Sequence, residues 1–176
     1  MMRRWIPRLR EWDRKLFRWC HFRIRHTALD RLFGWLTHLG GATFTIAFTL
    51  SVALLAPEPW RTVGRISLLS LAASHIVAAI VKRKVDRLRP YMAIGGVVTG
   101  PNPLKDPSFP SGHTTAAFSV VVPFALASGW LSLLVVPLAA AVGLSRMYLG
   151  LHYPSDCMAG CLIGSAVSAA AMSLIG

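Results

Sequence analysis

The sequence contains little cysteine, and this shortage argues against two classes of protein. Its three cysteines are Cys20, Cys157 and Cys161, which form neither a secreted disulfide framework nor a paired set of metal ligands. Cys157 and Cys161 are four residues apart in an apolar stretch, so we expect them to be small packing residues. The sequence also shows no internal repeat and no low-complexity tract.

Acidic residues are scarce as well. There are 7 of them against 19 lysines and arginines, and the formal net charge is +12. The cations lie in the N-terminal segment and beside apolar runs, where anionic membrane lipids or a phosphorylated lipid substrate are better partners than nucleic acid. The basic region continues through residue 31 before the first long apolar run begins, which argues against a cleavable signal peptide.

Hydrophobic residues make up 54% of the chain and the mean hydropathy is +0.52, which favours a membrane protein. The run 114–145 has no charged residue, and as a single helix it would be about 48 Å long. That length exceeds a hydrocarbon core of about 30 Å, so we expect two helices with a turn near Ser128 and Gly129. The predicted membrane spans are 39–56, 66–81, two helices within 114–145, and 157–176.

A basic amphipathic helix is predicted over residues 3–25. Tryptophan and leucine recur there at the three- and four-residue spacing of a helix face, and arginines fill other positions. This pattern is typical of a helix that lies in the membrane interface. The alternative is a helix that packs on the protein's own body.

These patterns together predict an all-α fold. It is a multi-span membrane helix bundle of about five transmembrane helices, with an N-terminal interfacial amphipathic helix. We expect residues 1–38 to form the basic interfacial segment and residues 39–176 to form the membrane-embedded domain.

Polar residues outside the N-terminal segment gather in three short clusters, at 82–90, 110–113 and 145–156. Two predicted crossings separate the second cluster from the third, and a proline-rich polar loop joins the first to the second. All three clusters should therefore emerge on the same membrane face, which is where we expect the functional site.

The cations of these clusters indicate an anion-binding site. Lys82, Arg89 and Arg146 converge on one face. Charged residues near membrane depth are costly unless they are paired with an opposite charge or have a function. Arginine suits this role because its planar group binds two phosphate oxygens at once. Lys82 could instead be an ordinary positive flank of its span. Ser111 and Gly112 open a predicted helix, whose first N–H groups point toward an anion.

The two histidines of the clusters suit phosphoryl transfer. His113 is placed to give a proton to a leaving group as a general acid. His152 and Asp156 are four residues apart, and a carboxylate bonded to one ring nitrogen would leave the other free to attack phosphorus. Asp156 could equally be only a helix cap. The same three residues could also bind zinc or iron, but nearby lysine and arginine repel a divalent ion, so we expect no metal and no other cofactor.

The three clusters resemble the signature of the type-2 phosphatidic acid phosphatase superfamily. The signature is a lysine, six residues and Arg-Pro, then Pro-Ser-Gly-His, then Ser-Arg, five residues, a histidine, three residues and an aspartate, and this sequence matches every position. The resemblance implies that His152 is the nucleophile, Asp156 its orienting carboxylate and His113 the general acid. It also implies that the phosphoryl oxygens are held, without a metal, by Lys82, Arg89, Ser111, Gly112 and Arg146. Vanadium haloperoxidases share this cradle, but they are soluble. Many bacterial members have six spans, and this chain departs from them with five.

Residues and resemblance together predict an integral membrane lipid phosphatase. It would remove a terminal phosphate from a lipid phosphate or polyprenyl diphosphate through a phosphohistidine. The alternatives are a lipid-linked phosphotransferase that uses the same histidine, and a non-catalytic protein that binds lipid phosphates.

The predicted location is the cell membrane, with several crossings. Of the 19 lysines and arginines, all but Arg61 and Arg65 lie on the side of the N-terminus and the clusters. The positive-inside rule then places the active site on the cytoplasmic face. Resemblance to bacterial relatives points instead to the external leaflet.

Overall fold

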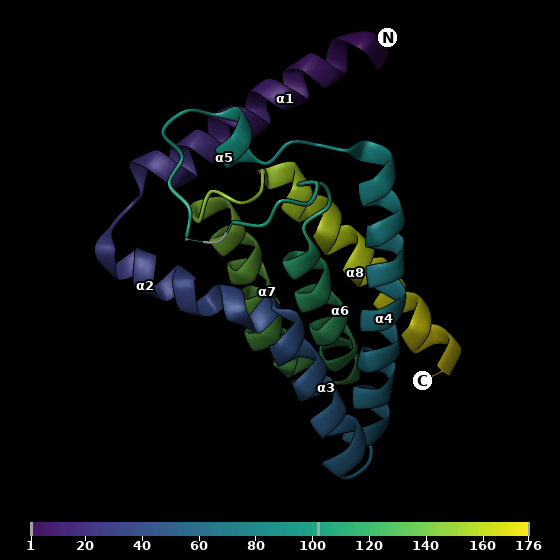
Figure 1. Ribbon diagram of the computed structural model, residues 1–176. Helices are drawn as coiled ribbons and strands as arrows, with labels where there is room; N and C mark the ends of the chain where they lie inside the picture. The colour runs from purple at the N-terminus through teal and green to yellow at the C-terminus, as the bar shows by residue number, and fades with distance from the viewer. Residues whose placement is uncertain (1, 102, 176) are drawn as a thin grey trace.

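The computed structural model describes residues 2–101 and 103–175, with side chains described from residue 8 onward. Within these ranges every regular element is a helix, which confirms the all-α prediction (Figure 1). The elements are α1 (Met2–Arg18), the π-helical turn η1 (Trp19–Arg23), α2 (Thr27–Leu36), the 3₁₀ turn η2 (Thr37–Gly40), α3 (Ala42–Leu55), α4 (Trp60–Val85), α5 (Pro90–Ala93), α6 (Gly112–Ala127), α7 (Gly129–Tyr148) and α8 (Pro154–Ile175).

The spans largely follow the sequence prediction. The stretches of α4, α7 and α8 are long and apolar enough to cross a membrane, and α6 ends one residue before Ser128, where the turn was expected. A fourth span is possible if α2 with η2 and the following α3 act as one, although this pair is bent by 52°. α6 is apolar but shorter. The multi-span bundle is thus confirmed, while the count of about five spans stays a prediction.

The chain passes very close to α6 at Gly40, next to the bend between η2 and α3. A Cβ atom on Gly40 would lie 2.7 Å from the His113 carbonyl oxygen and 2.6 Å from a Val142 methyl group. Only glycine therefore permits the chain to pass this close to the first turn of α6. The predicted span 39–56 accordingly begins inside η2, and its straight helical part is α3.

α6 is the central helix of the bundle, and it packs against α4, α7 and α8. Small residues on α8 allow a close approach to α6, since a Cβ atom on Gly160 would lie 2.7 Å from the Ser111 carbonyl oxygen. Serine hydroxyls join the helices further along α6: Ser74 and Ser119 are hydrogen bonded at 2.6 Å, and Ser168 donates to the Ser119 carbonyl at 3.0 Å. The helix that begins with the second cluster is therefore held on three sides.

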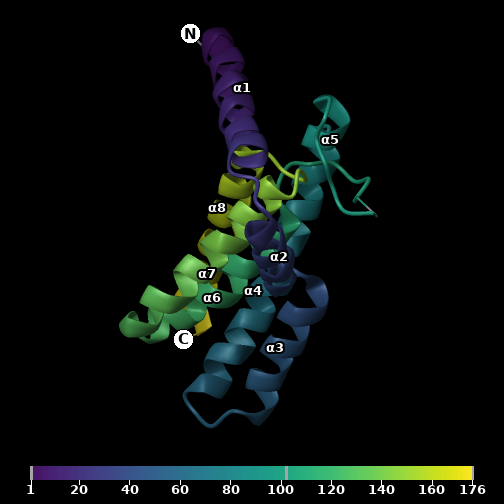
Figure 2. The same ribbon diagram turned by 90° about the vertical axis from the view of Figure 1, so that its left-hand side faces the viewer.

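The N-terminal helix is α1, continued by η1, and it lies at one end of the bundle and points away from it (Figures 1 and 2). One of its faces is exposed, including Trp12 at 72% and Trp19 at 55%. The opposite face is buried, with Phe17 at 0%. An exposed tryptophan face beside a membrane bundle supports the interfacial role, which stays a prediction.

Several contacts join the N-terminal segment to the bundle. His21 bonds the Tyr148 carbonyl at 2.7 Å through its Nδ1, and the Tyr148 hydroxyl donates to Asp30 at 2.8 Å. Both contacts cross the expected domain boundary at residue 38. That boundary stays a prediction, but the segment before it packs on the end of α7.

Candidate active site

The three polar clusters meet at the end of the bundle that lies next to α1 (Figure 1). The first covers the end of α4 and the link to α5, the second covers the start of α6, and the third covers the end of α7 and the start of α8. Arg89 from the first cluster contacts His152 of the third at 3.0 Å. The backbone N–H of Ser111, from the second, donates to the Asp156 carbonyl at 2.9 Å.

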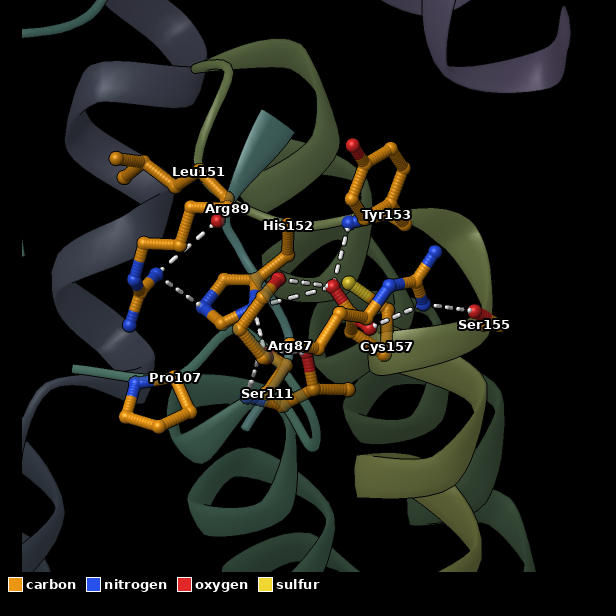
Figure 3. Close-up of polar contacts among 12 residues, drawn as sticks. Arg87, Arg89, Pro107, Ser111, Leu151, His152, Tyr153, Ser155 and Cys157 are labelled. Atoms are coloured by element: carbon orange, nitrogen blue, oxygen red, sulfur yellow. Dashed lines mark hydrogen bonds and ion pairs between the residues drawn. The ribbon is translucent and has the colours of Figure 1, made fainter. Parts of the chain in front are cut away.

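The hydrogen bonds of His152 decide which ring nitrogen carries the proton (Figure 3). Arg89 Nη1 lies 3.0 Å from Nε2, and a guanidinium group can only donate, so Nε2 is the acceptor. Nδ1 therefore carries the hydrogen, which it donates to the Ser108 carbonyl at 2.8 Å. Nε2 is therefore the ring nitrogen without a hydrogen.

His152 is neutral near pH 7. Its side chain is buried, and burial lowers its pKa to about 4 because an imidazolium loses its hydration there. Asp156 opposes this shift, while the guanidinium groups of Arg146 and Arg89 reinforce it. A neutral ring keeps the Nε2 lone pair that a nucleophile needs.

Asp156 sits beside the ring without bonding it directly. Its Oδ2 lies 3.7 Å from His152 Nδ1 and accepts hydrogen bonds from the Ser108 hydroxyl and, at 2.7 Å, from the Tyr153 N–H. Its Oδ1 accepts from Arg87 Nη1 at 2.7 Å. The sequence suggested a direct carboxylate–imidazole bond, but here Ser108 bridges the two groups, because its carbonyl accepts from His152 and its hydroxyl donates to Asp156.

Lys82 and Arg89 share one anionic partner, the carboxylate of Asp106. Arg89 Nη2 donates to Asp106 Oδ1 at 2.8 Å, and Lys82 donates to Oδ2. Burial alone would raise the pKa of Asp106, but these two cations outweigh it and hold the pKa below its ordinary value. The structure thus brings Lys82 and Arg89, two of the cations of the first cluster, onto one anionic group.

Arg146 is 3% exposed and has unused donors. Its Nη1 donates to Thr37 Oγ1 at 2.7 Å, whereas Nε and Nη2 have no acceptor among the residues that the structure describes. A buried donor without a partner costs ~1–3 kcal/mol. Two such donors on one guanidinium group suit a ligand with several anionic oxygens.

The start of α6 completes the site. Ser111 accepts from the Thr114 N–H at 3.4 Å and from its hydroxyl at 3.0 Å, so it caps the helix. A Cβ atom on Gly112 would meet nothing within 4 Å, which leaves the first turn open. His113 is half-buried and lies close enough to Arg146 and His152 to interact electrostatically with both.

The alternative of a metal site finds no geometric support in residues 2–101 and 103–175. No three histidine, cysteine, aspartate or glutamate side chains group there as ligands. Asp156, one of the three candidates, has both carboxylate oxygens occupied by Arg87, Ser108 and Tyr153. The cations of the site would also repel a divalent ion.

The motif residues fall within a region that matches a known family. The model described as the PAP2 superfamily matches residues 64–176, which is more than half of the chain and includes all three clusters. The chain belongs to the PAP2 superfamily. The resemblance inferred from the three clusters is thereby confirmed.

Two curated members of the PAP2 superfamily illustrate the similarity. Decaprenylphosphoryl-5-phosphoribose phosphatase from Mycobacterium tuberculosis is 41% identical over 97 residues, which are 54% of this chain and 52% of that protein. Undecaprenyl-diphosphatase from Sulfolobus acidocaldarius is 31% identical over 121 residues, which are 68% of this chain and 58% of that protein. The match therefore spans little more than half the length of these relatives.

A solved structure shares the fold. The crystal structure of Aquifex aeolicus LpxE superposes with a TM-score of 0.81 at 23% identity, and the alignment covers 90% of this chain and 93% of that one. The helical bundle of this PAP2 chain is therefore an established architecture.

Sequence reasoning missed four residues of this PAP2 site. Arg87 lies in the first cluster but was not among the candidate residues, yet it contacts Asp156. Asp106 and Ser108 lie in the loop just before the second cluster. Acidic residues are scarce in this chain, so the position of Asp106 beside a cluster could have indicated it, and the position of Ser108 could have indicated that residue too. Thr37 could not be found from the sequence, because no residue near it in the chain indicates a contact with Arg146, 109 residues away.

Proposed function

We propose that this chain is a lipid phosphatase that uses His152 as its nucleophile. It removes a terminal phosphate from a lipid phosphate or a polyprenyl diphosphate. The observation that carries the proposal is the state of His152, whose neutral ring keeps an unprotonated Nε2 next to Arg89 and near the unused donors of Arg146.

In the first step the Nε2 lone pair attacks phosphorus, and the bond between phosphorus and the leaving oxygen breaks. His113 gives its proton to that oxygen, so the lipid leaves as an alcohol or a monophosphate. Arg89, Arg146 and Lys82 neutralise the charge on the phosphoryl oxygens, and the open first turn of α6 at Gly112 adds N–H groups. The phosphorylated ring is cationic, and the nearby carboxylate of Asp156 stabilises it.

In the second step water attacks the phosphohistidine and the bond between phosphorus and Nε2 breaks. The neutral His113 takes a proton from the water, which restores its acid form. Inorganic phosphate leaves, and His152 returns to the neutral ring with its hydrogen on Nδ1. The cations of the site supply the charge neutralisation, and the proposal invokes no metal.

The surroundings of the site support a lipid substrate. An apolar cavity of about 330 Å³ lies between α3, α6 and α7, and Leu39 and Val142 are among its lining residues. Val142 also packs beside Gly40, which contacts the His113 carbonyl. A hydrocarbon chain in this cavity would start next to the phosphoryl site. Anionic membrane lipids are further partners, through the basic positions of α1.

We also propose that the site faces the cytoplasm. The turn between α3 and α4, with Arg61 and Arg65 just after it, lies at the opposite end of the bundle from α1 (Figure 1). The remaining 17 of the 19 lysines and arginines belong to the end that carries the site or to the segment before it. This asymmetry supports a cytoplasmic site through the positive-inside rule.

Phosphate release by the purified protein and by His152→Ala tests the activity. Phosphatidic acid, phosphatidylglycerol phosphate and undecaprenyl diphosphate in detergent micelles form the substrate panel. We expect turnover by the wild type and a residual rate in His152→Ala below about one hundredth, because groups that act as a unit lose most of their catalysis together. A higher residual rate in a folded variant would overturn the assignment of the nucleophile.

Three controls separate the alternatives. Turnover should be insensitive to a chelator and blocked by vanadate, and loss of activity with the chelator would favour the metal site. Phosphate release that requires an added lipid or sugar hydroxyl as acceptor would identify a phosphotransferase. Tight binding of the lipids without turnover would identify a binding protein.

A further inference from the structure

α1 carries a buried carboxylate, Asp13, next to its exposed apolar face. Asp13 is 8% exposed, and its neighbours on the same buried stripe are Phe17 and Cys20. The other stripe exposes Trp12 and Leu16. A helix can lie on a membrane with its apolar stripe alone, so membrane binding does not explain why Asp13 is buried. A buried carboxylate is costly without partners, so the contacts of Asp13 should explain its burial.

The partners of Asp13 all belong to the active-site region. Arg87 Nη2 donates to Asp13 Oδ2 at 2.5 Å. Ser155, which immediately precedes Asp156, donates twice: its N–H to Oδ1 at 2.9 Å and its hydroxyl to Oδ2 at 2.6 Å. One carboxylate on α1 thereby holds both the link after α4 and the first turn of α8.

Arg87 connects Asp13 to Asp156, which lies beside His152. The Nη1 atom of Arg87 donates to Asp156 Oδ1 at 2.7 Å and to the Ser155 hydroxyl at 2.7 Å, and its guanidinium group lies 4.0 Å from the centre of the Tyr153 ring (Figure 3). Asp13, Arg87 and Asp156 therefore form a chain of alternating charges. The chain ends 3.7 Å from the Nδ1 atom of the His152 ring.

We propose that Asp13 is a positioning residue for the phosphoryl-transfer site, acting through Arg87 on Asp156. This inference rests on the proposed function. Asp156 stabilises the cationic ring that forms when His152 is phosphorylated, but Arg87 offsets part of its charge. Asp13 in turn offsets Arg87, so the three groups together keep a net charge of −1 toward the ring. Without the Asp13 charge the net charge is zero, and the cationic intermediate is less stable.

Asp13→Asn removes the negative charge of Asp13 and keeps the shape of its side chain. The amide oxygen can still accept from the Ser155 N–H, but the amide nitrogen cannot accept from Arg87. Losing a charged hydrogen bond that supports the transition state should lower kcat on the order of tenfold. KM and inhibition by inorganic phosphate should change less than twofold, because Asp13 does not touch the phosphate cradle. The loss should be the same for a lipid in vesicles and for a short-chain soluble phosphate.

The pH midpoint of the acid limb of kcat/KM is a second measurement. Inactive protein lowers the rate equally at every pH, so it does not change this midpoint. The charged and titratable groups that face His152 are Arg89 from the link to α5, Arg146 from α7, His113 from α6 and Asp156 from α8. All of these remain in Asp13→Asn. Removing one negative charge nearby makes the ring harder to protonate, so the limb should move toward lower pH.

Glu11→Gln is the matched control. It removes one negative charge from the same helix, but Glu11 is exposed and pairs only with Lys15 at 2.8 Å among the residues that the structure describes. We expect its kcat and its acid limb to equal those of the wild type. An equal loss in Glu11→Gln would show a general effect of helix charge and overturn the inference.

A second background tests whether Asp13 acts through Arg87. In Arg87→Gln the connection to Asp156 is absent, so adding Asp13→Asn should lower kcat no further. Losses that multiply would mean that Asp13 acts by another route, and a wild-type kcat in Asp13→Asn would mean that it does not act at all. Loss confined to lipid in vesicles would assign Asp13 to membrane binding.

The contact itself is tested without any assay of activity. In Asp13→Ala, amide hydrogen exchange over residues 153–157 should be faster than in the wild type, since Ser155 loses its acceptor. Unchanged exchange would overturn the inference. An inactive wild type whose exchange responds to Asp13→Ala would instead refute the proposed function and leave the α1 contact established.

Discussion

At the scale of single residues, the protonation state of His152 follows from what its neighbours can donate. The Arg89 guanidinium can only donate, so the tautomer has an unprotonated Nε2 that accepts from Arg89, and Nδ1 donates its hydrogen to the Ser108 carbonyl. Burial and the two arginines then keep the ring neutral. In the proposed mechanism the same arginines would hold the phosphate and keep the His152 ring neutral for attack.

This arrangement predicts how activity depends on acidity. A protonated Nε2 has no lone pair, so activity is lost as pH falls through the pKa of His152, which lies at about 4 instead of the ordinary 6.5. We expect the acid limb of kcat/KM, corrected for ionisation of the substrate, to have its midpoint at about pH 4. Initial rates across a pH series give the midpoint. A midpoint at 6.5 would contradict the proposed state of the ring.

At the scale of helices, the contact between α6 and α8 positions the second and third clusters. Gly160 and Gly164 occur at the spacing that allows two membrane helices to approach closely. A Cβ atom on Gly164 would lie 2.6 Å from the Thr115 carbonyl oxygen and 2.9 Å from the Ser119 nitrogen. Neither of these backbone atoms can move without moving α6.

Gly164→Ala should therefore destabilise the bundle. Inserting a methyl group into this contact costs about 1–3 kcal/mol. We expect a lower Tm in detergent micelles, measured by thermal unfolding. The matched control is Gly34→Ala in α2, where a Cβ atom would meet nothing within 4 Å and helix propensity favours alanine. Equal Tm values for Gly164→Ala and the wild type would show that α6 and α8 are not held this closely.

At the scale of the whole molecule, one end of the bundle carries the site, α1 and most of the positive charge, and the other end carries the α3–α4 turn (Figures 1 and 2). Orientation in the membrane therefore determines which leaflet supplies the substrate. A cytoplasmic site would draw lipid phosphates from the inner leaflet, where α1 also meets anionic lipids.

Labelling of single cysteines tests this orientation. Cys20, Cys157 and Cys161 are first replaced, and a cysteine is then introduced as Gly100→Cys near the site or as Glu58→Cys in the α3–α4 turn. A Cβ atom on Gly100 meets nothing within 4 Å, so the change is tolerated there. With a cytoplasmic site, a membrane-impermeant thiol reagent should label Glu58→Cys in intact cells and leave Gly100→Cys unlabelled. The reverse pattern would place the site in the external leaflet.

The sequence by itself determined the long apolar helices and the meeting of the three clusters, but it did not predict α2 or the short α5. Uncharged runs of membrane length can only be helices where no water satisfies the backbone, and the even number of crossings between the second and third clusters brings them to one face. The roles predicted for Lys82, Arg89, Arg146 and the two histidines rest on residue chemistry and on the signature, which need only residue type and spacing.

The tertiary structure alone decided how these groups are held. Asp13 and Ser155 are 142 residues apart in the chain, and Arg87 and Asp13 are 74 apart, so no local pattern connects them. Asp156 lies four residues from His152, yet Ser108, 44 residues before His152, accepts its ring hydrogen. Spacing along a helix or turn limits which side chains can reach one another, but packing between helices decides which acceptor lies within hydrogen-bond distance.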